Sequence, residues 1–175
     1  MSWLYDTVAE EWSKWLPSSA IETVKKGGYY SVMATPKLKL ISLNSNFCYR
    51  PNFWILMNTV DPGNQLTWLI SELDKAEKDG HYVMIISHIP PDSDCLKSWV
   101  HNYIRIMERY QHLLVAQYQG HTHWDEIGVL YSNHSGTIKP VGVSYVGPSL
   151  TTYEHINPAY RIFTLNGNVT CLKQT

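Results

Sequence analysis

The stretch Tyr82-Val83-Met84-Ile85-Ile86-Ser87-His88-Ile89-Pro90-Pro91 decides the fold. It opens with an uninterrupted apolar run, which is typical of a central β-strand covered on both faces. The run is followed by a histidine and then two prolines, which restrict the backbone of the loop. We therefore predict a buried strand over residues 82–86 that places His88 just beyond its carboxyl end.

Helices and further strands are predicted on both sides of this run. Residues 62–78 carry an apolar stripe at helical spacing, with Asp61 as the N-cap, Pro62 in the first turn and Gly80 after the last turn. Two more helices are expected, over residues 3–15 and 96–113. Strands are expected over residues 29–34, 38–43, 115–118, 127–131, 141–146 and 160–165. Helix followed by strand, twice over, and then a run of strands indicates an α/β layered fold.

Composition and charge narrow the class of protein. The chain has 175 residues, of which 44% are hydrophobic, enough for one domain with a buried core. Its net charge is −1 and it has no long basic run, so we expect no nucleic-acid partner. No apolar stretch reaches the ~18 residues of a membrane span. Residues 1–6 lack the pattern of a signal peptide.

Histidines follow two of the predicted strands. His88 follows the first, and His121 and His123 lie in a Gly-His-Thr-His motif after the strand at 115–118. Ligand sites of α/β folds lie outside the carboxyl ends of strands. Gly120 would let the backbone turn sharply, and an extended His-x-His pair would place both imidazoles on one side. Because neutral imidazole is a good zinc ligand, the three histidines predict a metal site at one edge of the sheet.

Several further motifs resemble one known family. They are Asn46-Phe47-Cys48, Asn52-Phe53-Trp54, Asp61-Pro62-Gly63-Asn64-Gln65-Leu66, His88-Ile89-Pro90-Pro91, Cys95-Leu96-Lys97-Ser98-Trp99 and Thr151-Thr152-Tyr153. Together with Gly-His-Thr-His they resemble the acid sphingomyelinases, zinc phosphodiesterases of the calcineurin-like metallophosphoesterase superfamily. The resemblance runs from about residue 3 to residue 167. It implies a layered sandwich of sheets flanked by helices, of which residues 1–175 would form the C-terminal half of the catalytic domain.

The resemblance also implies a site with two zinc ions and a role for individual residues. His88 and His121 would bind one ion and His123 the other, while Tyr153 would lie at the mouth of the site near the substrate head group. Two nitrogens that bind one zinc ion at ~2.0–2.1 Å must lie within ~4 Å of each other. We therefore expect that separation between His88 and His121.

The same resemblance extends to processing and substrate. It implies a disulfide between Cys48 and Cys95, and a lysosomal or secreted glycoprotein of lipid metabolism. The sequons at Asn133 and Asn168 are compatible with glycosylation. The implied substrate is sphingomyelin or another phosphodiester lipid, cleaved to ceramide and phosphocholine. The Cys-Leu-Lys-Ser-Trp block favours this substrate over the nucleotides that sister phosphodiesterases cleave.

The family's Asp-x-His, Gly-Asp and Gly-Asn-His-Glu motifs are not found where the site would need them, because Asp79-Gly80-His81 spells Asp-x-His but precedes its strand, at the wrong end. They supply the bridging Asp, an Asn ligand and a proton-donating His, and we expect them upstream of residue 1. The chain alone is therefore expected to be inactive, and to meet a membrane surface only through other parts of the protein. Two alternatives stay open. One is a truncated product that binds metal or a partner without catalysis, and the other is a sister enzyme acting on nucleotides.

Overall fold

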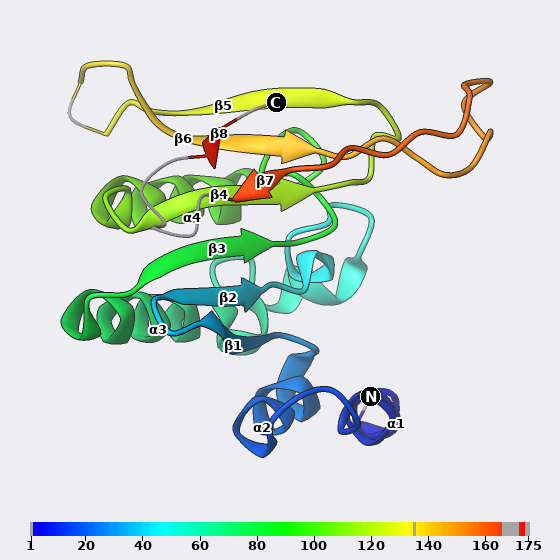
Figure 1. The fold of residues 1–175 in the computed structure, drawn as a ribbon, viewed down its shortest axis with the longest axis vertical. Helices are drawn as coiled ribbons and strands as arrows, with labels where there is room; N and C mark the ends of the chain where they lie inside the picture. The colour runs from blue at the N-terminus through cyan, green and yellow to red at the C-terminus, as the bar shows by residue number, and fades with distance from the viewer. Residues whose placement is uncertain (1, 135, 166–171, 174–175) are drawn as a thin grey trace.

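A mixed sheet forms the centre of the molecule in a computed structural model, which describes residues 2–134, 136–165 and 172–173. Its strands are arranged in the order β1-β2-β3-β4-β6-β5 (Figure 1). The strands β2, β3, β4 and β6 are parallel, and β1 and β5 run antiparallel along the two edges. Their bounds are Tyr30–Thr35 for β1, Leu38–Ser42 for β2, Tyr82–Ile86 for β3, Leu114–Gln119 for β4, Glu126–Ser132 for β5 and Lys139–Val146 for β6. The α/β class predicted from the sequence is confirmed.

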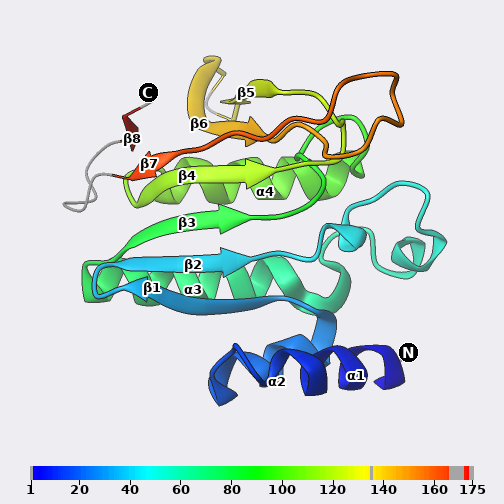
Figure 2. The ribbon, with the colours of Figure 1, turned by 45° about the vertical axis from the view of Figure 1, so that its right-hand side comes forward.

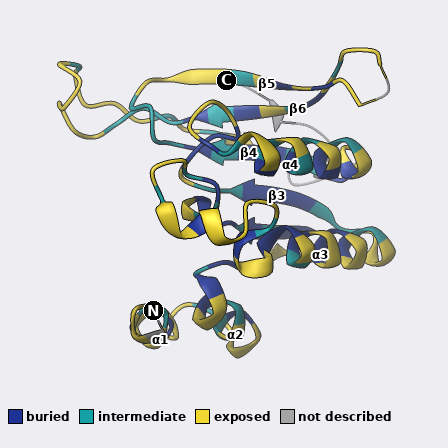
Figure 3. Ribbon diagram, turned by 180° about the vertical axis from the view of Figure 1, so that it is seen from behind, coloured by how far each residue is buried: buried dark blue, intermediate teal, exposed yellow. Residues whose placement is uncertain are grey.

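Helices connect the parallel strands and cover one face of the sheet. The helices α3 (Gln65–Asp79) and α4 (Lys97–Tyr110) form the crossovers from β2 to β3 and from β3 to β4, and both lie on the same side (Figures 2 and 3). The helices α1 (Ser2–Trp12) and α2 (Ser18–Gly27) lie beside the β1 edge. In the part of the chain that the structure describes, no helix is both long and apolar enough to cross a membrane.

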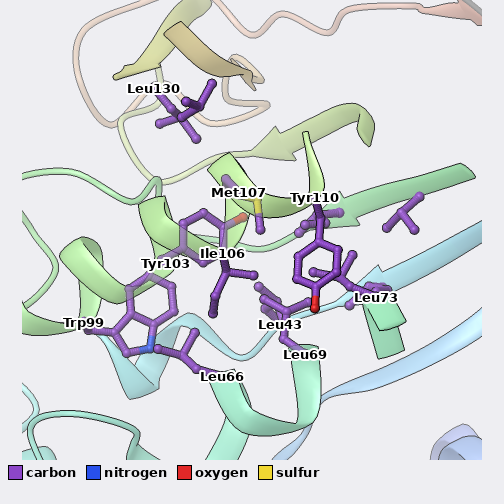
Figure 4. Packing of buried hydrophobic residues seen from close by; sticks show 14 of the residues in the cluster. Leu43, Leu66, Leu69, Leu73, Trp99, Tyr103, Ile106, Met107, Tyr110 and Leu130 are labelled. Carbon is purple, nitrogen blue, oxygen red and sulfur yellow. The ribbon is translucent and has the colours of Figure 1, made fainter. Parts of the chain in front are cut away.

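The core lies between the sheet and the two crossover helices (Figure 4). From β3, Val83 and Ile85 point into it and are fully buried, as the apolar run predicts. From the helices come Leu66, Leu69, Leu73, Trp99, Tyr103, Ile106 and Met107. Within this core, the Tyr103 hydroxyl of α4 donates to Gln117 Oε1 of β4 at 2.6 Å, which satisfies two buried groups.

The helix predicted over residues 62–78 begins later than expected. Gly63 has a left-handed φ of 65°, which separates the short 3₁₀ helix η3 (Pro62–Asn64) from α3. Asp61 nevertheless acts as a cap, because its carboxylate accepts the backbone N–H of Leu66 at 2.7 Å. At the other end, Gly80 adopts φ 68° and its N–H closes the last turn, as predicted.

Two predictions at the ends of the chain were incomplete or wrong. The helix expected over residues 3–15 stops at Trp12, and a second helix, α2, follows with Pro17 as its N-cap. The strand expected over residues 160–165 is reduced to β7 (Thr164–Leu165), which pairs with β8 (Leu172–Lys173). Before β7 the chain is held by side chains, because Phe163 packs against the ring of Tyr118 with centroids 4.7 Å apart.

Candidate metal centre

The topology of the sheet brings together the histidines that we predicted as metal ligands. Because β3 and β4 are parallel neighbours, the loops that follow them leave at the same edge (Figure 1). Hydrogen bonding continues beyond both strands. Ser87 N–H donates to Tyr118 O at 3.1 Å, and Gly120 N–H donates to His88 O at 2.9 Å. These bonds place His88 directly beside the Gly-His-Thr-His loop.

His88 and His121 face each other through one nitrogen each. Nε2 of His88 lies 3.4 Å from Nδ1 of His121, within the separation expected from the sequence. Two ligands of a tetrahedral zinc ion, each at ~2.0–2.1 Å, lie ~3.3 Å apart, so the pair has the spacing of two ligands of one ion. Partial burial, and then the neighbouring rings of His121 and His123, lower the pKa of His88. This favours the neutral imidazole that binds metal.

His123 lies in the same loop as His121, but its ring contacts Tyr153. Its ring meets that of Tyr153 edge-on, with centroids 6.0 Å apart, and its backbone carbonyl accepts the N–H of Ser149 at 3.1 Å. Its Nδ1 is buried and finds no hydrogen-bond partner among the described residues. A buried polar nitrogen without a partner is costly, so this atom has the character of a ligand position. Tyr153 itself is 76% exposed, as a residue at the mouth of a site would be.

The backbone of the Gly-His-Thr-His loop differs from the expected extended segment. His121 has φ 79° and His123 has φ 68°, both in the left-handed region. The two imidazoles are therefore not placed by strand alternation but by two left-handed residues that turn the chain. Gly120, which we expected to make the turn, does not have a positive φ. Non-glycine residues in this conformation carry strain of order 1–3 kcal/mol, and such residues cluster at functional sites.

A disulfide joins the loop after β2 to the loop after His88. Cys48 and Cys95 are bonded, with Cα atoms 4.6 Å apart, which confirms the predicted pairing. Around it, Tyr49 forms an antiparallel bridge with Cys95, and Leu96 N–H donates to Cys48 O at 2.8 Å. Both cysteines are buried, and their bond ties the two loops together beside the histidines.

Sequence reasoning missed one acidic residue at this site. Oδ2 of Asp94 lies 3.1 Å from Nε2 of His121, the ring nitrogen that faces away from His88. The ring of Tyr49 meets the same imidazole edge-on, with centroids 5.7 Å apart. The only signal in the sequence was indirect, since Asp94 precedes Cys95 and the implied disulfide would draw its loop towards the site.

The described residues do not complete a metal site by themselves. Within residues 2–134, 136–165 and 172–173, no three His, Cys, Asp or Glu side chains form a group that could hold an ion. The assignment of His88, His121 and His123 as ligands therefore stays a prediction. Of the two sequons, Asn133 is exposed after β5, and Asn168 lies outside the described residues.

Known proteins resemble this chain along almost all of its length. Sphingomyelin phosphodiesterase of Bos taurus is 50% identical over 166 residues, a match that covers 95% of this chain and 26% of that protein. The chain is homologous to a segment of the sphingomyelin phosphodiesterases. It spans about a quarter of the length of these relatives, since the human protein, 49% identical, is also covered to 26%. The family resemblance inferred from the motifs is thus confirmed.

Two further likenesses are more distant. The cyclic GMP-AMP phosphodiesterase SMPDL3A of Homo sapiens is 38% identical over 176 residues, a match that covers 91% of this chain and 38% of that protein. The solved structure of PhoD has a TM-score of 0.56 with 14% identity and covers 78% of this chain and 32% of that chain. This second likeness concerns the fold alone. No family model matches the sequence.

Proposed function

We propose that this chain is part of a zinc-dependent phosphodiesterase that hydrolyses sphingomyelin to ceramide and phosphocholine. The observation that carries the proposal is the 3.4 Å approach of His88 Nε2 and His121 Nδ1, at the edge of the sheet where the parallel strands end. The homology to proteins named sphingomyelin phosphodiesterases supports the substrate.

Zinc fits the side chains at this edge. His88 and His121 have the spacing of two ligands of one ion, and His123 presents a buried nitrogen without a partner in the described part of the chain. In a site with two ions, His88 and His121 would hold one and His123 the other. Bound zinc stabilises charge on a phosphoryl group and lowers the pKa of a bound water. The three histidines would hold the ions beyond the carboxyl ends of β3 and β4.

Tyr153 is proposed to contact the substrate head group. Its ring is exposed and lies beside His123. A phosphocholine head group carries a quaternary ammonium, which is attracted to the face of an aromatic ring. The Cys48–Cys95 disulfide supports a lysosomal or secreted location, because such bonds persist in oxidising compartments. Glycosylation at Asn133 and Asn168 belongs to the same proposal.

A chimera tests the activity. The matched segment of bovine sphingomyelin phosphodiesterase is replaced by this chain, and phosphocholine release is measured with zinc present. We expect turnover that falls at least ~100-fold in His88→Ala and His121→Ala, because each change removes a metal ligand. His101→Ala, an exposed histidine of α4, is the control and should be unaffected. A folded, active chimera whose rate survives both ligand changes would refute the assignment.

The chain without the fusion is expected to be inactive in the same assay. Catalytic zinc needs about three protein ligands for each ion, and three histidines do not complete two such sites. Two cations ~3.5–4 Å apart also need an anionic bridge to offset their repulsion. Turnover by the 175-residue chain comparable to that of the chimera would contradict this expectation.

A second candidate activity is cleavage of a nucleotide phosphodiester, which the similarity to SMPDL3A favours. It would use the same histidines, because the hydrolysed group is a phosphodiester in both cases. The chimera and its parent should therefore be assayed with sphingomyelin and with cyclic GMP-AMP side by side. A gain of nucleotide cleavage in the chimera, with loss of phosphocholine release, would favour this second activity.

A further inference from the structure

The two ring nitrogens of His121 face two different side chains. Its Nδ1 faces Nε2 of His88 at 3.4 Å, and its Nε2 faces Oδ2 of Asp94 at 3.1 Å. We propose that Asp94 is a positioning residue for His121, holding the ring so that the lone pair of Nδ1 points at the metal. The inference rests on the proposed function, because it assumes that His121 is a zinc ligand.

The chemistry of metal-bound histidine explains why a carboxylate belongs there. A neutral imidazole carries one proton, and the nitrogen without it binds the metal. A carboxylate that accepts the N–H of the other nitrogen fixes the tautomer and the ring orientation. Because an ionised carboxylate can only accept, the contact with Asp94 favours the neutral tautomer that carries its proton on Nε2, in which the free lone pair is on Nδ1, the atom that faces His88.

Asp94 is itself held in place by the two linked loops. Its backbone carbonyl accepts the N–H of Arg50 at 2.8 Å, and its own N–H donates to Oδ1 of Asp92 at 3.1 Å. The next residue, Cys95, is bonded to Cys48. The carboxylate therefore projects from a backbone segment that is anchored on both sides.

The other acids that flank the histidines have different partners. Oδ2 of Asp125 pairs with Arg161 at 2.7 Å, and Oε2 of Glu126 accepts the hydroxyl of Thr122 at 2.9 Å. Asp92 holds the backbone of Asp94, as described above. Across the described ranges, Asp94 is thus the carboxylate that forms an ion-pair contact with one of the three predicted ligands.

The contact has little to contribute to overall stability. The side chain of Asp94 is 53% exposed and that of His121 is 22% exposed. Exposed ion pairs contribute little to folding free energy, so removal of the carboxylate should leave the fold intact. A loss of zinc binding in a folded variant would therefore report on positioning.

The first test titrates the 175-residue chain with Zn²⁺ alone. Asp94→Ala is expected to weaken zinc affinity about 10–100-fold, the usual effect of removing a partner of a metal-bound histidine. Asp94→Asn keeps an acceptor oxygen and should restore part of the loss. Asp79→Ala makes the same change of charge at an exposed position at the end of α3, and should bind zinc like the wild type. Equal zinc affinity of Asp94→Ala and the wild type would overturn the inference.

The second test needs no metal. Nitrogen-15 shifts of His121, recorded above the ordinary imidazole pKa of ~6.5, give the fraction of rings protonated on Nε2. We expect this fraction to be higher in the wild type than in Asp94→Ala, and an unchanged fraction would also overturn the inference. The variant His121→Ala separates the proposal that His121 binds zinc from the proposal that Asp94 positions its ring. If it binds zinc like the wild type, the ligand assignment fails, and the shifts still decide the contact of Asp94 with His121.

Discussion

In the Gly-His-Thr-His loop, the residue with the left-handed φ is His121, and the preceding Gly120 does not have one. Gly120 has no positive φ, and a Cβ there would meet Nδ1 of His88 at 3.6 Å, an ordinary contact. We expect Gly120→Ala to change the free energy of unfolding by less than ~1 kcal/mol and to keep zinc binding. Gly63→Ala is the contrast, because Gly63 has φ 65° and a Cβ would lie 2.8 Å from the ring of Phe47. Urea unfolding of both variants checks this, and equal destabilisation would contradict it.

At the scale of single residues, the sequence could predict those contacts that follow from where strands end. His88 and His121 follow parallel strands, so their meeting follows from the alternation of apolar runs and loops. Asp94 could not be found in this way, because its contact with His121 joins two loops and no periodic pattern records such a contact. The left-handed φ of His121 was equally hidden, since only a few per cent of non-glycine residues have a positive φ and the sequence expectation fell on the neighbouring glycine.

Between elements, α3 is joined to the sheet by a buried carboxylate. Glu72 of α3 bonds Lys39 of β2 at 3.1 Å, Ser31 of β1 at 2.7 Å and Lys75 at 2.7 Å. Burial raises the pKa of Glu72, but the bonds from Lys75, Ser31 and Lys39 outweigh it, so that the pKa is lowered. A lowered carboxyl pKa contributes stability above the unfolded value of ~4.3, and this is lost as the pH falls through the folded value.

Glu72→Gln should therefore be less stable than the wild type at neutral pH, by about 1–3 kcal/mol, because it loses charged hydrogen bonds to Lys39 and Lys75. The difference should shrink as the pH is lowered below ~4.3, where the unfolded carboxyl is protonated, and it should be lost once the pH has fallen through the lower pKa of Glu72 in the folded chain. Urea unfolding at a series of pH values measures it. The exposed Glu22→Gln serves as the control, and a difference that stays constant with pH would contradict the prediction.

Elements with an apolar period were predicted well, and those held by single side chains were not. The strand β3 and the end of α3 follow directly from an apolar run and a glycine cap. The segment at residues 160–163 has the composition of a strand, but its backbone pairs with no strand in the described part of the chain. It is fixed instead by Arg161 pairing with Asp125 and by Phe163 packing between Tyr118 and Tyr145. Such long-range contacts override local propensity.

For the whole molecule, the disulfide is the covalent link between distant parts of the sequence. Cys48 and Cys95 are 47 residues apart, and a loop of this length contributes about 4 kcal/mol on the chain-entropy model. We expect the Cys48→Ser, Cys95→Ser double variant to lose that much in urea unfolding without reductant. Reduction of the wild type should give a similar loss. A double variant as stable as the oxidised wild type would show that packing alone holds the two loops together.

That covalent link has a consequence for proteolysis. The short helix η2 (Phe53–Met57) lies inside the closed loop, and most of its side chains are exposed, with Phe53 80%, Trp54 68% and Met57 84% exposed. A protease that cleaves after aromatic residues should cut here early. The nicked chain would then migrate as one species in a denaturing gel without reductant and as two fragments with it. A cut in η2 would therefore leave the two pieces covalently joined.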